Sequence, residues 1–169
     1  MNVAALDAII FDFDGVLTDN RIYVDDAGRE IVCCNRADGL AFDALRQTHV
    51  RVFILSTEGS PVVQSRAAKL KVLSYSGVTD KLSFIIKLAA DHGFNLSRTL
   101  FVGNDLNDLE AMRACGASAC PSDSHPSVVQ IATFRLSSRG GSGVARELVE
   151  RILALPISGV PAQGGDNKP

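Results

Sequence analysis

The chain has 169 residues, a formal net charge of −2 and a pI near 5.9. This length suffices to bury one hydrophobic core without disulfides or a structural metal, and the mean hydropathy of +0.15 is that of a globular chain. It contains no block of basic residues and no run of 18 apolar residues, so we expect neither a nucleic-acid partner nor a membrane span.

The first half of the chain alternates short apolar runs with amphipathic stretches. Ala8–Phe13 predicts a buried strand that ends at Gly15. Two apolar triplets, at 22–24 and 31–33, flank the turn-forming residues 25–28 and predict a β-hairpin over about 21–35. The patterns that follow predict a helix over 40–47, a strand over 50–55, a helix over 61–71 with a proline in its first turn, and a strand over 72–75.

The second half continues this alternation up to a tail, residues 156–169, that is rich in glycine and proline and is expected to fray. Its predicted elements are helices over 79–92, 106–115, 127–132 and 144–155 and strands over 99–102, 118–120 and 134–136. Alternating strands and helices predict an α/β fold, a parallel sheet with helices on both faces. We expect residues 1–155 to form one domain.

The cysteines indicate the compartment. Cys33, Cys34, Cys115 and Cys120 form no Cys-x-x-Cys pair and no zinc-type grouping with the three scattered histidines. Free thiols and the lack of a signal sequence predict a cytoplasmic protein.

Polar residues follow three of the predicted strands. Asp12 and Asp14 end the first, Ser56 and Thr57 follow the second, and 103–108 (Gly-Asn-Asp-Leu-Asn-Asp) follow the strand over 99–102. The carboxyl ends of parallel strands meet at one edge of a sheet, where α/β proteins bind ligands. Two carboxylates so close repel each other, and a divalent cation relieves that repulsion. Oxygen donors of this kind suit Mg²⁺.

Three further segments carry groups that suit a phosphate. Ser56 and Thr57 offer hydroxyl and backbone N–H groups, although a simple turn needs the same residues. Lys81 opens a helix and either neutralises phosphate charge or is a solvated surface residue. The segment 139–143 (Arg-Gly-Gly-Ser-Gly) either bends backbone toward an anion or is a flexible helix start capped by Ser142.

In this order the motifs resemble the haloacid dehalogenase superfamily of aspartate-nucleophile phosphatases, over about residues 8–155. The four superfamily motifs correspond to Asp12-x-Asp14, Ser56, Lys81 and Gly103-Asn104-Asp105-x-x-Asp108. Residues 14–19, 35–39, 78–81 and 139–143 are similar to the capless subgroup that acts on 2-keto-3-deoxy sugar acid phosphates. That subgroup includes phosphatases for eight-carbon (octulosonate) 8-phosphates and nine-carbon ulosonate 9-phosphates, and domains attached to acylneuraminate cytidylyltransferases.

The resemblance implies a three-layer Rossmann-like fold with a hairpin flap, no cap domain, and a Mg²⁺-dependent reaction. Asp12 would be the nucleophile and Asp14 the general acid and base. The implied ligands and contacts are as follows: Mg²⁺ on Asp12, the Asp14 carbonyl and either Asn104 or Asp105; the phosphoryl group on Ser56, Thr57 and Lys81; Asp108 orienting Lys81 or a metal-bound water; and the sugar acid near Asn35, Asp38, Glu58, Arg66 and Lys69.

Two departures from the family pattern bear on specificity and metal binding. Many members have an Asp-Asp pair where this chain has Asn104-Asp105, so a neutral amide replaces one charged ligand. Glu58 stands where the octulosonate enzymes usually have arginine, and this favours a nine-carbon substrate. Arg66 and Lys69 are expected either to meet the substrate carboxylate or to face solvent.

The resemblance also implies an assembly: four copies form a homotetramer in which each hairpin helps close a neighbouring site. One alternative is a non-catalytic, phosphatase-like oligomerisation domain linked to acylneuraminate activation. The other is a phosphorylated receiver domain, which also uses an acidic Mg²⁺ pocket, but the Asp-x-Asp at the end of the first strand disfavours it.

Overall fold

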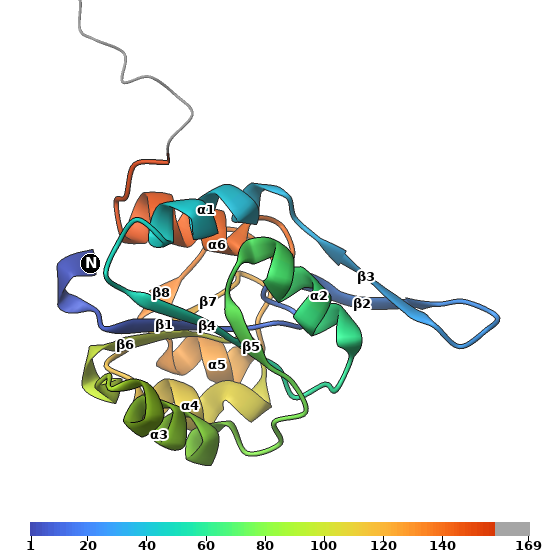
Figure 1. Ribbon diagram of the computed structural model, residues 1–169, viewed down its shortest axis with the longest axis horizontal. Coiled ribbons are helices and arrows are strands. Elements are labelled where there is room, and N and C mark those ends of the chain that lie inside the picture. The colour runs from blue at the N-terminus through green and yellow to red at the C-terminus, as the bar shows by residue number, and fades with distance from the viewer. Residues whose placement is uncertain (158–169) are drawn as a thin grey trace, which may run out of the picture.

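A computed structural model describes residues 1–157 of the chain, so most of the tail predicted over 156–169 lies outside the described residues. Its centre is a six-stranded sheet in the order β5-β4-β1-β6-β7-β8, and every pairing in it is parallel (Figure 1). The strands are β1 (Ala8–Asp12), β4 (Arg51–Leu55), β5 (Leu73–Tyr75), β6 (Thr99–Val102), β7 (Ala117–Cys120) and β8 (Phe134–Arg135).

Strand β1 lies inside the sheet, and all five of its residues are buried. It pairs with β4 on one side and β6 on the other. Its side chains alternate between the two faces: Ile9 and Phe11 belong to one hydrophobic cluster, and Ala8 and Ile10 to the other. Strands β4 and β5 lie on one side of β1 and β6, β7 and β8 on the other, so the order of strands reverses beside β1, and a ligand site is expected at its carboxyl end.

Helices cover both faces of the sheet, which confirms the predicted three-layer α/β architecture (Figure 1). One layer contains α1 (Ala37–Leu45), α2 (Pro61–Leu70) and α6 (Val144–Glu147), which continues in a π-helical turn over Leu148–Ile152. The other layer contains α3 (Lys81–His92), α4 (Leu109–Ala114) and α5 (Pro126–Ile131). Within residues 1–157, no helix is long and apolar enough to cross a bilayer.

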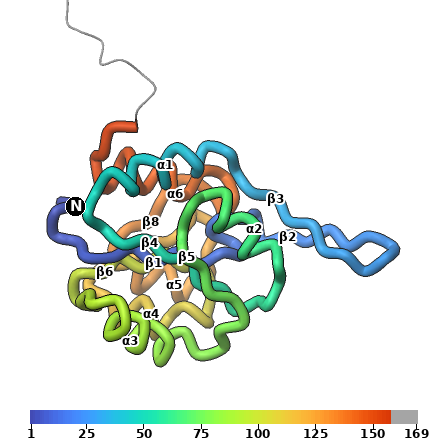
Figure 2. The backbone as a smooth tube through the Cα atoms, in the orientation of Figure 1, coloured from blue at the N-terminus to red at the C-terminus, as the bar shows by residue number. Residues whose placement is uncertain are grey.

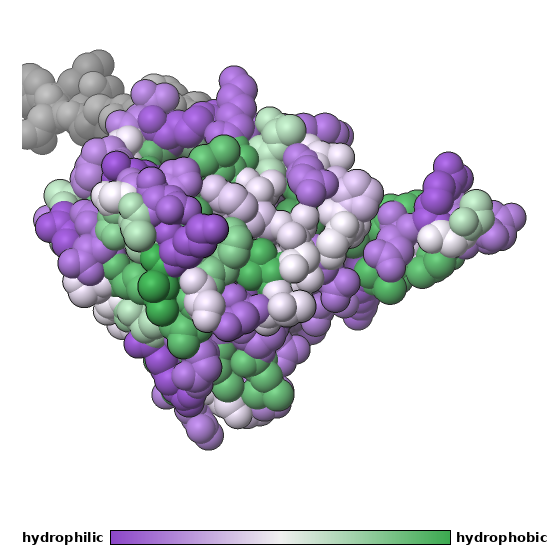
Figure 3. All heavy atoms as spheres, turned by 60° about the horizontal axis from the view of Figure 1, so that its bottom comes forward, coloured by the Kyte–Doolittle hydropathy of each residue, from purple (hydrophilic) through white to green (hydrophobic). Residues whose placement is uncertain are grey.

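The predicted hairpin is present as β2 (Thr18–Val24) and β3 (Glu30–Cys34), and it projects away from the body of the molecule (Figures 1 and 2). Large apolar side chains on it are open to solvent: Ile22 and Tyr23 are each 58% exposed, and Ile31 is 57% exposed. Figure 3 shows hydrophobic atoms along this arm among hydrophilic ones. A two-stranded arm of this kind has little core of its own.

Local capping places two helix starts later than the sequence pattern does. The Asp80 side chain accepts a hydrogen bond from the Ser83 N–H at 3.0 Å, so α3 begins at Lys81 rather than at residue 79. Asp105 and Asp108 form a reciprocal capping box around a 3₁₀ turn at Leu106–Asp108, so α4 begins only at Leu109.

Candidate active site

Side chains from three strand ends and the loops that follow them, with one residue of β2, line a cavity of about 160 Å³ at the carboxyl edge of the sheet. Asp12 ends β1, Ser56 follows β4, and Asn104 follows β6. The convergence predicted from the sequence is therefore present. The residues lining the cavity are Asp12, Asp14, Asn20, Ser56, Thr57, Glu58, Asn104, Asp105 and Asn107.

Lys81 is the buried cation of the site. It is 2% exposed, and its Nζ donates to Asp12 Oδ1 at 2.7 Å and to Asp108 Oδ1 at 2.6 Å. It is therefore not a solvated surface lysine. Burial acts to lower the pKa of Lys81, but the two carboxylates outweigh it and the pKa is raised.

Two carboxylates share this one ammonium group, so the buried cluster keeps an uncompensated negative charge. Asp12 is 4% exposed and Asp108 is fully buried. Burial, and then the charge of Asp108, raise the pKa of Asp12, while Lys81 opposes the rise. A further positive charge beside Asp12 would relieve this, which makes the cluster a suitable neighbour for a divalent cation.

The sequence pattern placed Asp14 at the end of the first strand, but in the structure Asp14 lies in the turn after β1. Because the strand ends at Asp12, the two carboxylates leave the backbone in different directions: Asp12 meets Lys81, whereas Asp14 Oδ2 accepts a hydrogen bond from Ser56 Oγ at 3.3 Å. Ser56 Oγ in turn accepts from the Glu58 N–H at 3.1 Å. Burial is the main cause that raises the pKa of Asp14, and the negative charges of Glu58 and Glu30 add to it.

Asn104 carries the test of whether a metal fits. Its side-chain amide has two orientations that exchange oxygen and nitrogen. In one, Nδ2 donates to the Asp14 backbone oxygen and to Asp12 Oδ2, each at 3.0 Å. In the other, Oδ1 takes that place and lies 3.0 Å from each of these two oxygens, with no hydrogen between them. Cis oxygens around Mg²⁺ are about 3.0 Å apart, since Mg–O distances are about 2.1 Å in an octahedron. The donors present therefore fit Mg²⁺.

Gly15 is what allows Asn104 to reach this position. Its φ of +82° lies in the left-handed region, and a Cβ there would come within 2.0 Å of Asn104 Nδ2. A larger residue would therefore displace the amide.

The carboxylates of Asp105 and Asp108 accept hydrogen bonds from backbone N–H groups of the loop after β6. Asp105 Oδ1 accepts from the Leu106 N–H at 2.7 Å, and Asp108 Oδ2 accepts from the Asn104 N–H at 2.8 Å. Within the described residues, no group of three His, Cys, Asp or Glu side chains has metal-binding geometry. This agrees with a donor set of one carboxylate, one backbone carbonyl and one amide, in which only Asp12 belongs to those four residue types.

The glycine-rich segment 139–143 supports the loop that follows β1. A Cβ on Gly140 would lie 2.3 Å from the Gly15 carbonyl oxygen, and one on Gly141 would lie 2.4 Å from the Asp19 nitrogen. The Gly141 N–H donates to Val16 O at 3.0 Å. Ser142 does not cap α6: the N-cap is Gly143, which has no side chain to do so. The close approach of two backbones thus explains this motif.

Two residues in the cavity were missed by sequence reasoning. Asn107 Nδ2 donates to Thr57 Oγ1 at 2.9 Å and joins the β4 and β6 loops. Asn20 lines the cavity from β2 with a φ of +62°, a conformation that asparagine tolerates better than most residues. An isolated asparagine in a strand-like pattern gives no signal for this.

The outer substrate candidates are not gathered at the cavity. Asp38 is 1% exposed, and its Oδ1 accepts from the Arg146 N–H at 3.1 Å, so it joins α1 to α6 and does not line the cavity. Asn35 Oδ1 accepts from the N–H of Ala37, the first residue of α1, at 2.9 Å, and its backbone oxygen accepts from Arg66 Nη2 at 2.7 Å. Lys69 is exposed on α2. Of the expected sugar-acid contacts, only Glu58 lines the cavity.

Known proteins are similar to this chain in both sequence and fold. The profile of the haloacid dehalogenase-like hydrolases matches residues 55–148. A 3-deoxy-D-manno-octulosonate 8-phosphate phosphatase from Haemophilus influenzae is 34% identical over 146 residues, which is 86% of this chain and 81% of that protein.

Two solved structures are similar throughout. A haloacid dehalogenase family hydrolase from Streptomyces avermitilis has a TM-score of 0.86 at 37% identity, covering 89% of this chain and 86% of its own. The octulosonate 8-phosphate phosphatase of Moraxella catarrhalis, solved with a magnesium ion, a phosphate ion and the sugar acid KDO, has a TM-score of 0.85 at 29% identity, covering 89% and 87%. The chain therefore belongs to the haloacid dehalogenase-like hydrolases and is an enzyme of their phosphatase type.

Proposed function

We propose that this enzyme is a Mg²⁺-dependent phosphatase that hydrolyses a 2-keto-3-deoxy sugar acid phosphate, with a nine-carbon ulosonate 9-phosphate favoured over the eight-carbon 8-phosphate. The observation that carries the proposal is the setting of Asp12. One of its oxygens is fixed by the buried Lys81, and the Asn104 amide lies 3.0 Å from the other and from the Asp14 backbone oxygen. Relatives that are 34% and 29% identical to this chain are named as octulosonate 8-phosphate phosphatases, which supports the substrate class.

In the proposed reaction, Asp12 attacks the phosphorus and forms an aspartyl phosphate while the sugar oxygen leaves. Asp14 donates a proton to that oxygen, and its raised pKa favours the protonated form needed for this step. Asp14 then takes a proton from the water that hydrolyses the aspartyl phosphate. Lys81, Ser56 and Thr57 hold the phosphoryl oxygens, and Asp108 holds Lys81 in place.

Asp12, the Asp14 carbonyl and the Asn104 side-chain oxygen would hold Mg²⁺, with Asn104 preferred to Asp105 because the Asp105 carboxylate is engaged by the backbone. The ion would neutralise charge on the transferring phosphoryl group and help align it.

Glu58 supports the nine-carbon preference. It lines the cavity beside Asp14, and a carboxylate accepts hydrogen bonds from hydroxyl groups but repels a carboxylate. Arg66 and Lys69 do not line the cavity of their own chain. They would instead contact the carboxylate of a substrate bound in a neighbouring copy. Asn35 is a backbone contact of Arg66 and would act through it.

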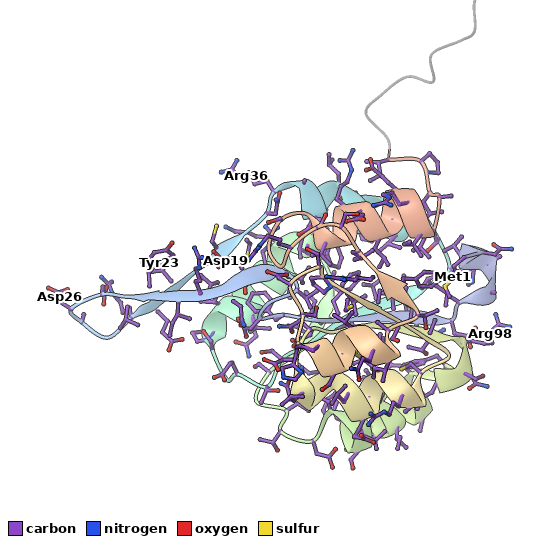
Figure 4. All side chains as sticks on the ribbon, turned by 180° about the vertical axis from the view of Figure 1, so that it is seen from behind. Met1, Asp19, Tyr23, Asp26, Arg36 and Arg98 are labelled. Carbon is purple, nitrogen blue, oxygen red and sulfur yellow. The ribbon has the colours of Figure 1, made fainter. Side chains whose placement is uncertain are left out.

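We also propose a cytoplasmic homotetramer in which residues 1–155 form one catalytic domain. The four cysteines are free, which suits a reducing compartment. The exposed apolar side chains of the hairpin, including Val24 at 59%, support burial against another copy. Tyr23 points outward from this arm (Figure 4). Sedimentation of the Tyr23→Ser variant should show fewer tetramers, and an unchanged monomer in both proteins would contradict the assembly.

The central test is phosphate release from eight- and nine-carbon ulosonate phosphates. Activity should disappear with a chelator and in Asp12→Asn, and should persist in Asp91→Asn, which changes an exposed aspartate on α3. Glu58→Arg should shift the preference toward the eight-carbon substrate. Turnover that resists both the chelator and Asp12→Asn would contradict the mechanism, whereas an unchanged preference in Glu58→Arg would contradict only the specificity.

A further inference from the structure

A continuous cleft leads from the phosphoryl cavity toward the hairpin. A second cavity of about 300 Å³ shares Asp14, Asn20 and Glu58 with the first. An open groove of about 530 Å³ shares Glu30 and Glu58 with that second cavity. This path leads away from the side of Asp12 that Lys81 occupies, and so it offers room for the leaving group of a bound phosphate ester.

Glu30 faces this cleft because of its register on β3. It pairs with Val24 of β2, and it shares a strand face with Val32 and Cys34, since alternate residues point to the same side. Val32 and Cys34 pack against the main core, so this face of the hairpin is turned toward the body. Glu30 therefore lines the cleft from the hairpin wall, while Glu58 lines it at the other wall, just before α2.

The middle of the cleft is acidic. Asp14, Glu30 and Glu58 line the second cavity, and no lysine or arginine lines it. Among the residues that line the outer groove, only Arg29 is cationic, and its Nε is paired with Asp25 at 2.7 Å. Carboxylates only accept hydrogen bonds when ionised, so this part of the cleft suits groups that donate, and it repels anions.

We propose that Glu30, opposite Glu58, is a specificity-determining residue that binds the hydroxyl groups of the leaving sugar next to the ester oxygen. The pair rejects leaving groups that carry a negative charge close to that oxygen. This inference rests on the proposed phosphatase function and refines it. A ulosonate 8- or 9-phosphate satisfies it, because its carboxylate is at the opposite end of the carbon chain from its phosphate and a polyol lies between them.

The test compares kcat/KM on three esters with Mg²⁺: a nine-carbon ulosonate 9-phosphate, 3-phosphoglycerate, whose carboxylate is close to the ester, and p-nitrophenyl phosphate, which has no hydroxyl groups to bind. In Glu30→Gln, the ratio of ulosonate to p-nitrophenyl phosphate turnover should fall about 10-fold, mainly through KM, since a neutral amide replaces the charged acceptor of the hydrogen bond. Glu30→Arg should in addition raise the ratio of 3-phosphoglycerate to p-nitrophenyl phosphate.

Asp26→Asn is the matched control, because Asp26 is an exposed carboxylate at the hairpin tip, away from the cleft (Figure 4). It should leave all three ratios unchanged. Ratios that stay constant in both Glu30 variants, or that fall equally in Asp26→Asn, overturn the role of Glu30 even when the wild type is active. Failure of the wild type on all three esters would instead overturn the proposed function.

Discussion

Asp38 offers a prediction that depends only on the fold. It is buried between α1 and α6, and its Oδ2 has no hydrogen-bond partner. Burial raises its pKa from 3.8 to about 6, although the Arg146 N–H and the charge of Arg66 act in the opposite direction. The folded state therefore binds a proton more tightly than the unfolded state does. Ionisation of Asp38 costs folding free energy, and that cost should disappear in Asp38→Asn.

The sign and size follow from proton linkage. Between pH 3.8 and about 6 the folded state carries more protons on Asp38, so the contribution of Asp38 to the free energy of unfolding falls as the pH rises through this window. One pKa unit corresponds to about 1.4 kcal/mol, which gives a full cost of about 3 kcal/mol above pH 7. About 2 kcal/mol of it should develop between about pH 4.5 and pH 7.5.

The assay is urea unfolding of wild type and Asp38→Asn across that pH range. The unfolding free energy of wild type minus that of the variant should decrease by about 2 kcal/mol with rising pH. Titration of every other group cancels in this difference. Asp38→Ala removes the same titration, so its difference should have the same slope despite a different offset. A flat difference, or one that rises with pH, would refute the reasoning.

Three further outcomes are expected. Lys81→Met leaves Asp12 and Asp108 buried without a cation and should lower the unfolding free energy by about 3–5 kcal/mol, measured in chelator. Lys87→Met, which changes an exposed lysine on the same helix, is the control and should be nearly neutral. Equal stabilities of the two variants would contradict the buried triad. Asn104→Asp should raise Mg²⁺ affinity about 10-fold by calorimetry and destabilise the metal-free protein, and unchanged affinity would show that residue 104 is not a ligand. Gly141→Ala should reduce the melting temperature more than Gly28→Ala does. Both glycines have a positive φ, but of the two only Gly141 would bring a Cβ against backbone atoms. Equal decreases in melting temperature would exclude that clash.

The local pattern of this sequence was sufficient for the fold and for the centre of the site. Strand β1 could be predicted because residues 8–11 are an uninterrupted apolar run. Parallel strands bring their carboxyl ends together wherever helices connect them. The grouping of Asp12, Ser56 and Asn104 follows from that topology. For Lys81 the sequence left two interpretations open, and the structure decides between them by burying its ammonium group against Asp12 and Asp108.

Only the tertiary structure decided where side chains in loops and on the hairpin point. Asp38 resembles a substrate contact in sequence, but packing of α6 on α1 buries it. Asp105 resembles a metal ligand, but a capping box directs its carboxylate to the backbone. Glu30 and Glu58 come from separate elements, and their shared cleft depends on how the hairpin is turned toward α2. Short-range periodicity determines strands and helices, whereas the orientation of such side chains depends on contacts between segments far apart in the chain.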